Sequence, residues 1–243
     1  MHVFDYKERP EKLLTPEVVN QLGKIHELKG RQELFIEAAP DVLTSLLEIA
    51  KIQSTKASNK IEGIWTSDER LEAIVKEKSQ PRNRSEEEIS GYRDVLATIH
   101  ESYEYITPRP NNILQLHRDL YRFSDDSFAG KWKDSDNIIA ERLPGGRTVA
   151  RFTPTSAAET PAAMERICSE YSIHISKETY DPLLISLAFV FDFVSIHPFN
   201  DGNGRMSRLL TLLLLYRSGY TVGKYISIEK VGAARATAYR RAE

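Results

Sequence analysis

The chain has 243 residues, of which 41% are hydrophobic and 28% are charged, which is enough for a sizeable buried core. Its formal net charge is −2, so no overall positive field would draw it to nucleic acid. The single cysteine, Cys168, excludes an intrachain disulfide, and the leucine run at 209–215 is far too short to cross a bilayer. Residues 1–12 are polar and carry no targeting pattern, so we expect a soluble cytoplasmic protein with no membrane partner.

Two helices are predicted in the first 63 residues. Thr15-Pro16 is a typical helix start, and this helix is expected to reach about Leu28. The second helix is expected from Pro40 to Glu62, and Gly63 after it is an ordinary helix stop. Its apolar residues recur at helical spacing: Leu43, Leu46, Leu47, Ile49 and Ile52.

The helical pattern continues to about residue 123. Residues 66–69 and 85–88 each resemble a capping box, so a helix is expected to begin in each segment, near Ser67 and near Glu86. The polar stretch 78–84 between these helices is expected to be a loop. Residues 110–123 predict a further helix, in which His117 is expected to be a structural histidine.

Residues 132–153 depart from the helical pattern. Two short segments, 137–140 and 148–152, flank Pro144-Gly145-Gly146, which favours a turn. The sequence therefore predicts a β-hairpin in this part of the chain.

Two apolar helices are predicted after the hairpin. The first covers 182–196, with Asp181 as its cap and Pro182 in its first turn. The second contains the leucine run at 209–215. Between the two lies the run His-Pro-Phe-Asn-Asp-Gly-Asn-Gly-Arg-Met-Ser-Arg, residues 197–208.

The residues of this run suit a phosphate-binding site. Gly202 to Gly204 lie at the start of the second helix, where free N–H groups and small residues favour a bound anion. Arg205 and Arg208 are three residues apart and share one helix face. His197 has an imidazole that can accept a proton near neutral pH. Each residue alone has an ordinary structural explanation, but the combination predicts a polyphosphate pocket with a base.

The run also resembles the signature of the Fic family, His-x-Phe-x-(Asp/Glu)-Gly-Asn-Gly-Arg-x-x-Arg. Most members of that family transfer AMP from ATP to a protein hydroxyl and release pyrophosphate. The resemblance implies an all-α fold, a Fic-type helical bundle with a β-hairpin flap over the active site, and a protein adenylyltransferase activity. Every specified position matches: His197, Phe199, Asp201, Gly202, Asn203, Gly204, Arg205 and Arg208.

The family's roles carry over to these positions as implications of the resemblance. His197 would be the catalytic base that takes the proton from a Ser, Thr or Tyr hydroxyl of the target protein. Asp201 would hold the Mg²⁺ that bridges the α- and β-phosphates of ATP. The ATP-binding residues would be Gly202, Asn203 and Gly204, whose amides form an anion hole, together with Arg205 and Arg208 on the outer phosphates.

A second segment, 58–63, resembles the inhibitory motif (Ser/Thr)-x-x-x-Glu-(Gly/Asn) of Fic proteins. Taken alone it is weak, because Ser and Glu four residues apart occur on many helices. Beside a complete signature, it implies that Ser58, Glu62 and Gly63 are inhibitory. Glu62 would pair with Arg208 and occupy the place of the γ-phosphate. This implies the class with an N-terminal inhibitory helix, here at about 40–63.

The predicted hairpin lies where the family has its flap, which holds a target segment by strand addition. Ile138 and Ile139 are candidates for the clamp on the modified side chain. A plain surface hairpin, with Ile139 packed inward, is the alternative. Towards the C-terminus, Tyr239 matches a tyrosine that borders the adenine in relatives, whereas Arg240 stands in place of a second one.

We therefore expect an N-terminal helical region at 1–105 and a Fic core at 106–243 that is truncated at its C-terminus. The expected ligands are ATP and Mg²⁺. The expected partners are a protein substrate held by the flap, the chain itself as a target, a second copy in a homodimer, and nucleic acid only through a missing C-terminal domain. The alternative activities are removal of AMP, with Glu62 orienting water, or transfer of another nucleotide moiety. A nucleotide-sensing regulator is the non-enzymatic alternative.

Overall fold

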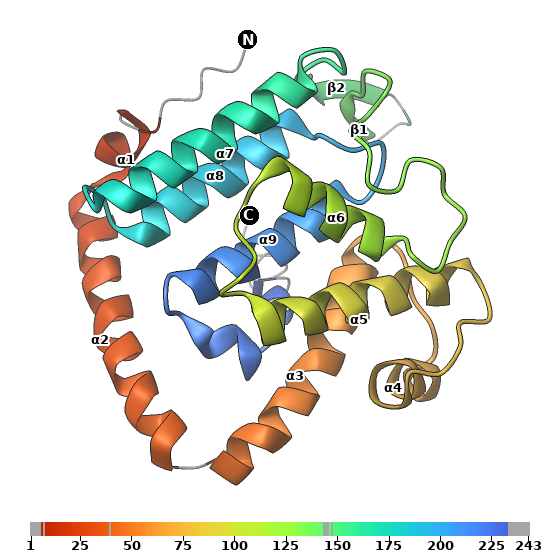
Figure 1. Cartoon of the computed structure of the whole chain (residues 1–243), viewed down its shortest axis with the longest axis horizontal. Helices are drawn as coiled ribbons and strands as arrows, with labels where there is room; N and C mark the ends of the chain where they lie inside the picture. The colour runs from red at the N-terminus through yellow and green to blue at the C-terminus, as the bar shows by residue number, and fades with distance from the viewer. Residues whose placement is uncertain (1–5, 7, 39, 143–145, 147, 233–243) are drawn as a thin grey trace.

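A computed structural model describes residues 6, 8–38, 40–142, 146 and 148–232. The predicted all-α architecture is confirmed, with helices packed around a central helix, α9, and a single two-stranded hairpin at one end of α7 (Figure 1). The described elements are α1 (Glu8–Leu13), α2 (Pro16–Ala38), α3 (Pro40–Ile61), α4 (Asp68–Glu77), α5 (Arg84–Ser102), α6 (Pro110–Leu120), β1 (Ile139–Arg142), β2 (Thr148–Phe152), α7 (Thr160–Lys177), α8 (Pro182–Ile196), α9 (Asn203–Arg217) and a 3₁₀ turn, η1 (Thr221–Lys224).

The first two long helices form the outer arms seen in Figure 1. Helix α2 starts at Pro16 as predicted but ends at Ala38, about ten residues later than the sequence analysis placed it. The segment after Leu28 contains glutamate, glutamine, leucine and alanine, which favour a helix, and Gly30 alone does not end it. Helix α3 spans Pro40–Ile61, which agrees with the bounds predicted for the second helix, and its inhibitory role stays a prediction.

Local capping explains where the next two helices begin. Ser67 caps α4 as predicted, because its hydroxyl accepts the N–H of Arg70. The predicted cap of α5 near Ser85 is wrong. Asn83, in an extended conformation, accepts the N–H of Glu86 at 3.0 Å, so this helix begins at Arg84. An asparagine is as good a cap as serine, and it stands two residues earlier.

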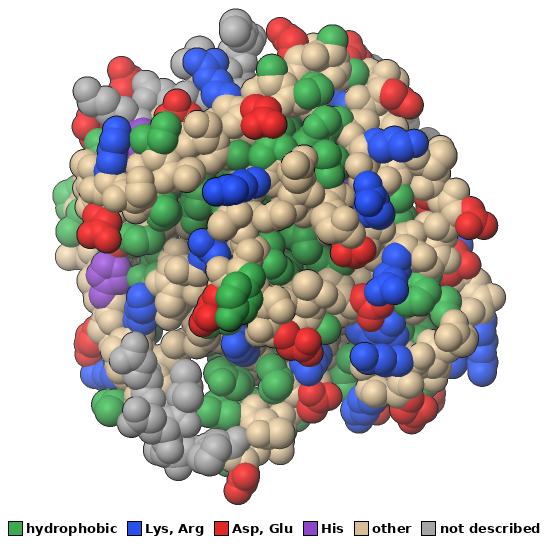
Figure 2. Space-filling view, viewed as in Figure 1, with side chains coloured by type: hydrophobic (Ala, Val, Ile, Leu, Met, Phe, Trp, Pro, Cys, Tyr) green, Lys and Arg blue, Asp and Glu red, His purple; other side chains and the backbone are tan. Residues whose placement is uncertain are grey.

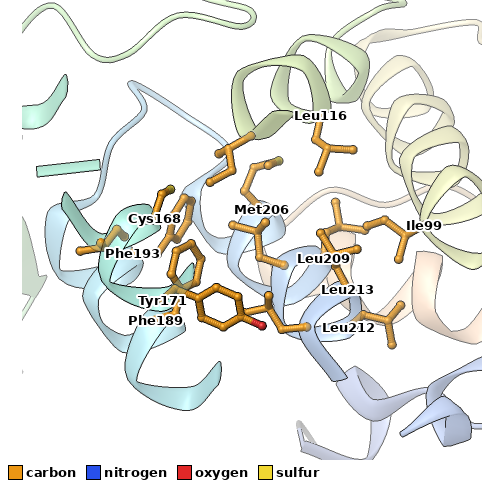
Figure 3. Close-up of a cluster of buried hydrophobic side chains, with 14 of the residues drawn as sticks. Ile99, Leu116, Cys168, Tyr171, Phe189, Phe193, Met206, Leu209, Leu212 and Leu213 are labelled. Carbon is orange, nitrogen blue, oxygen red and sulfur yellow. The ribbon is translucent and has the colours of Figure 1, made fainter. Parts of the chain in front are cut away.

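The core lies where α7 and α8 meet α9. Figure 3 shows aromatic side chains of α7 and α8 directed at aliphatic side chains of α9, with Ile99 of α5 and Leu116 of α6 closing the other side. Each buried leucine or phenylalanine contributes roughly 1.5–3 kcal/mol. The same cluster takes residues from both sides of position 105, so the two predicted regions share one core. Labelled members on α7, α8 and α9 are Tyr171, Phe189, Phe193, Met206, Leu209, Leu212 and Leu213.

The predicted hairpin is present as β1 and β2, which pair in antiparallel fashion with Glu141 opposite Val149. Its turn includes residues 143–145 and 147, which lie outside the described residues. The hairpin lies beside the start of α7 and the loop that joins α8 to α9 (Figure 1). Its role as a flap stays a prediction.

The surface is mixed in character. Figure 2 shows acidic, basic and hydrophobic side chains interspersed over the viewed face, in keeping with a net charge of −2. Within the described ranges, no helix combines the length and the apolar character that crossing a membrane requires.

Helices α5 and α6 approach closely at Gly91, and this contact is testable. A Cβ at this position would overlap the backbone carbonyl of Leu120, which cannot move without shifting α6. We expect Gly91→Ala to lower the free energy of unfolding by about 1–3 kcal/mol, measured by urea denaturation. Gly23→Ala in α2 is the matched control, because a Cβ there meets no atom within 4 Å. The control should be neutral or stabilising by up to about 1 kcal/mol, and equal losses in both variants would contradict the packing argument.

Candidate active site

The run 197–208 forms a short loop between α8 and α9, followed by the first turns of α9. Helix α8 ends at Ile196, and His197 adopts a left-handed conformation with φ 52° and ψ 62°. Its N–H still donates to the carbonyl of Phe193 at 3.0 Å. A residue other than glycine in this region costs on the order of 1–3 kcal/mol, so neighbouring groups must hold it. Gly202, with φ 81°, then starts α9.

The side chain of Asn203 closes this loop. Its amide nitrogen donates to the carbonyl of Phe199 at 2.8 Å, and its oxygen accepts the N–H of Phe199 at 2.9 Å. Phe199 is fully buried, so the pair of bonds anchors the middle of the loop to the core. The sequence analysis gave Asn203 a role through its backbone amide, and the structure adds this structural role for its side chain.

His117 supports the loop from α6 and is structural, as predicted. Its ring stacks on Phe199 with a centroid distance of 3.7 Å and an interplanar angle of 3°. Its Nδ1 accepts the N–H of Gly130 at 2.9 Å, so its Nε2 carries the proton that is donated to the carbonyl of Asp201 at 3.1 Å. Burial lowers the pKa of His117 to about 4, which keeps the ring neutral.

His197 is half-buried at the edge of this loop. Burial lowers the pKa of His197, and the positive charge of Lys133 lowers it further. The carbonyl of Val194 and the carboxylate of Glu62 act in the opposite direction. The net effect favours the neutral imidazole, which is the form that can accept a proton.

The two arginines of the signature lie in different surroundings. Arg205 is 1% exposed and its Nη2 lies 2.8 Å from Oε2 of Glu88 and 2.7 Å from the hydroxyl of Tyr121. Removing one partner of such a buried pair is strongly destabilising. Glu88 and Tyr121 were not found from the sequence, because no local spacing links residues more than eighty positions apart.

Arg208 instead faces the end of α3. Its Nη2 donates to Oε1 of Glu62 at 2.7 Å and to the carbonyl of Ser58 at 3.0 Å. Its Nε donates to the hydroxyl of Ser58 at 2.8 Å. The structure therefore brings together the two segments that the sequence analysis singled out, and Gly63, with φ 78°, follows directly.

Gly204 lies against this ion pair. A Cβ at position 204 would overlap the carboxylate of Glu62 and would lie 3.3 Å from Nη1 of Arg208. The backbone of Gly204 is ordinary helix, so the absence of a side chain serves space and not conformation. The glycine thus lets Glu62 reach the first turn of α9.

The carboxylate of Asp201 suits a Mg²⁺ ion that takes a single protein ligand. Its side chain is 54% exposed, and its Oδ1 accepts the N–H of Gly202 at 2.7 Å. Across the described ranges, no three His, Cys, Asp or Glu side chains come together. Mg²⁺ is often held by one or two carboxylates with phosphate oxygens and water as its other ligands, so the lone carboxylate fits.

The remaining predicted site residues lie elsewhere. Tyr239 falls outside the described residues. Ile138 is 63% exposed just before β1, and Ile139 is the first residue of that strand. A cleft of about 850 Å³ lies between the end of β2, the start of α7 and Ser195. Ser195 is the residue of α8 that lines this cleft, two positions before His197 in the sequence.

Comparison with known proteins agrees with this geometry. Residues 105–215 match the Fic/DOC family, a span that contains the whole 197–208 run. This part of the chain is similar to the Fic/DOC family. The segment 58–63 lies outside the matched span, so its assignment depends on the contacts with Arg208.

Curated relatives carry the same family name. The protein adenylyltransferase Fic of Nematostella vectensis is 26% identical over 207 residues, covering 82% of this chain and 45% of the relative. The protein of the same name from Drosophila erecta is 35% identical over 109 residues, covering 45% of this chain and 20% of the relative. The chain thus spans less than half the length of these relatives.

Solved structures show the same fold. A Fic family protein from Desulfovibrio desulfuricans has a TM-score of 0.72 at 24% identity, covering 94% of this chain and 66% of that one. A Fic domain containing signaling protein from Bacteroides thetaiotaomicron has a TM-score of 0.68 at 23% identity, covering 79% of this chain and 72% of that one. The predicted Fic-type helical fold is therefore confirmed.

The neutral state of His117 gives a pH-dependence prediction. The pKa of His117 is about 4 in the folded chain and about 6.5 when unfolded, so only the unfolded chain gains this proton between those values. The free energy of unfolding should therefore fall as pH drops from about 6.5 to about 4, measured by urea denaturation. In ¹H–¹⁵N spectra, His117 should keep its Nε2–H form at pH 5.5. A charged ring at that pH would contradict the hydrogen-bond assignment.

Proposed function

We propose that the chain is a protein adenylyltransferase that transfers AMP from ATP to Ser, Thr or Tyr hydroxyls of a target protein, and that Glu62 restrains it. The single observation that carries the proposal is the 2.7 Å contact between Glu62 and Arg208, next to a complete signature loop. A carboxylate on this arginine stands where an anionic ligand of the loop would bind. The relatives' name and the family match support the transfer chemistry.

The reaction can be written on the residues present. The target hydroxyl oxygen attacks the α-phosphorus, the bond from that phosphorus to the bridging oxygen breaks, and pyrophosphate leaves. His197 takes the hydroxyl proton, which its lowered pKa and half-buried position allow. A positioned base of this kind is worth about 10²–10⁴ in rate.

Charge on the phosphates would be met by the first turns of α9. Free N–H groups at a helix start, here around Gly204, attract anions. Arg208 has the bidentate geometry that suits phosphate oxygens. Asp201 would hold the Mg²⁺, which supplies positive charge to the leaving pyrophosphate.

Restraint by Glu62 follows from competition for Arg208. Glu62 lies just past the last residue of α3 and is 36% exposed, so its side chain can leave without disturbing the core. Ser58 contacts Arg208 independently through its hydroxyl and its carbonyl. We infer that Ser58 keeps the guanidinium oriented when Glu62 is displaced by the γ-phosphate.

The target protein would dock through the hairpin. Strands β1 and β2 form a two-stranded sheet within the described residues, so an extended segment can add to an edge through backbone hydrogen bonds. Ile138 and Ile139 would flank the modified side chain. This mode of docking places a hydroxyl while reading little of its sequence, and it allows the chain to modify itself.

Removal of the glutamate is the direct test. We expect Glu62→Gly to increase AMP incorporation from labelled ATP at least tenfold, because Arg208 becomes available to the γ-phosphate. His197→Ala in that background should abolish incorporation. Mass spectrometry after incubation with ATP and Mg²⁺ measures both, and it identifies the modified residue.

Lys60→Ala is the control, because Lys60 is exposed on the same turn, whereas the described bonds of Arg208 to this segment go to Ser58 and Glu62. Equal labelling of the wild-type and Glu62→Gly chains would exclude inhibition by Glu62. Loss of AMP from a modified target, dependent on Glu62, would indicate the reverse reaction, and a different added mass would indicate another nucleotide moiety. Binding without turnover of any nucleoside triphosphate would indicate a sensor.

Gly204 offers a second route to the same state. We expect Gly204→Ala to raise self-labelling of the wild-type chain, because its Cβ would push Glu62 away from Arg208. The same change in the Glu62→Gly chain should give no further increase, since there is no carboxylate left to displace. Additive increases in the double variant, measured by the same assay, would contradict this steric coupling.

A further inference from the structure

The unusual backbone of His197 raises the question of what holds it. The left-handed conformation must be stabilised by contacts from outside the loop, because its own amide makes only the bond to Phe193. The carbonyls on either side of it belong to Ile196, the last residue of α8, and to Pro198. Both accept from one residue that neither the signature nor the family resemblance names.

That residue is Lys133, in the segment between α6 and β1. Its backbone N–H donates to the carbonyl of Pro198 at 2.8 Å. Its Nζ donates to the carbonyl of Ile196 at 3.1 Å and to the side-chain oxygen of Asn137 at 2.9 Å. Lys133 therefore brackets His197 from both sides and also connects it to the base of the hairpin.

Lys133 is buried in an uncommon way for a lysine. It is 3% exposed, and in the described part of the chain its ammonium forms no ion pair within 4.0 Å. Burial lowers the pKa of Lys133, which is partly offset by the more distant Asp136. Within hydrogen-bond distance, the ammonium is met by a carbonyl and an amide oxygen. Burying a lysine ammonium costs free energy. A lysine that served only solubility would avoid this cost by lying at the surface.

The charge of Lys133 also acts on the imidazole. It lowers the pKa of His197, whereas the carbonyl of Val194 on α8 and Glu62, just past α3, raise it. The residue therefore influences both the position and the protonation of the same ring.

We propose that Lys133 is the positioning residue for His197, fixing the histidine in its left-handed conformation and holding the hairpin base against the catalytic loop. The role of His197 as base rests on the proposed function, but its anchoring by Lys133 does not. The described bonds of Lys133 go to Asn137, Ile196 and Pro198, and none of these is a proposed phosphate-binding residue. Its effect is on the chemical step and on the titration of His197, and not on ATP affinity.

The test compares Lys133→Met, Lys133→Arg and the control Lys131→Met in the Glu62→Gly chain. Methionine keeps the apolar stem but removes the charge and the donor to Ile196, whereas arginine keeps both. Lys131 is exposed two residues away, and only its backbone N–H makes a described bond, to Phe128. We expect Lys133→Met to lower kcat about 10²-fold with a KM for ATP within threefold, because a small displacement of a base costs about that much. Lys133→Arg should stay within about fivefold of the parent, and Lys131→Met should be unchanged.

A second readout does not depend on activity. In ¹H–¹⁵N spectra, the pKa of the His197 imidazole should rise in Lys133→Met and stay unchanged in Lys131→Met. A merely structural lysine would lower thermal stability without moving this titration. The proposal is overturned if His197 titrates identically in all three chains, or if KM for ATP rises as much as kcat falls. Absence of AMP transfer in the parent chain would count against the proposed function alone, because the NMR comparison still tests Lys133.

Discussion

The arrangement of the site depends on the turn between α8 and α9. Helices α8 and α9 both carry many buried apolar residues. His197 lies in the turn where the chain reverses between them. The loop is held by contacts from separate parts of the chain. Asn203 at the start of α9 bonds to Phe199, His117 of α6 bonds to Asp201, and Lys133 before β1 bonds to Ile196 beside His197. The bonds to these residues leave the imidazole at the edge of the core.

The two arginines illustrate how one short helix segment serves two purposes. Arg205 is directed inward to Glu88 and Tyr121, and it ties the start of α9 to α5 and α6. Arg208, one turn later, is directed to Ser58 and Glu62 at the end of α3. The inward arginine stabilises the loop, while in the proposed function the other would exchange a carboxylate for a phosphate. An ion pair at the surface contributes little free energy, so one partner can be replaced. Breaking a buried ion pair leaves an uncompensated charge and is strongly destabilising.

Much of the fold could be predicted from the sequence, because its signals are local. Three prolines mark helix starts: Pro16, Pro40 and Pro182. Ser67 is a good N-cap, and two short segments on either side of a glycine turn predicted the hairpin. The predicted cap near Ser85 was wrong because Asn83 offers an equally good acceptor earlier in the chain. In the site, the resemblance named the residues of the loop and the segment 58–63. Glu88, Tyr121 and Lys133 could not be found this way, since their partners lie sixty or more positions away and no spacing rule connects them.

The contact between Gly204 and Glu62 has an evolutionary consequence. Two positions that lie more than 140 residues apart in sequence occupy one small volume, so they cannot change independently. If Glu62 restrains the chain as proposed, a lineage that gains a side chain at 204 would lose that restraint in the same step, because the Cβ overlaps the carboxylate. Under the proposed function, a change of one codon, at position 62 or at position 204, would separate a restrained from an unrestrained form of this chain.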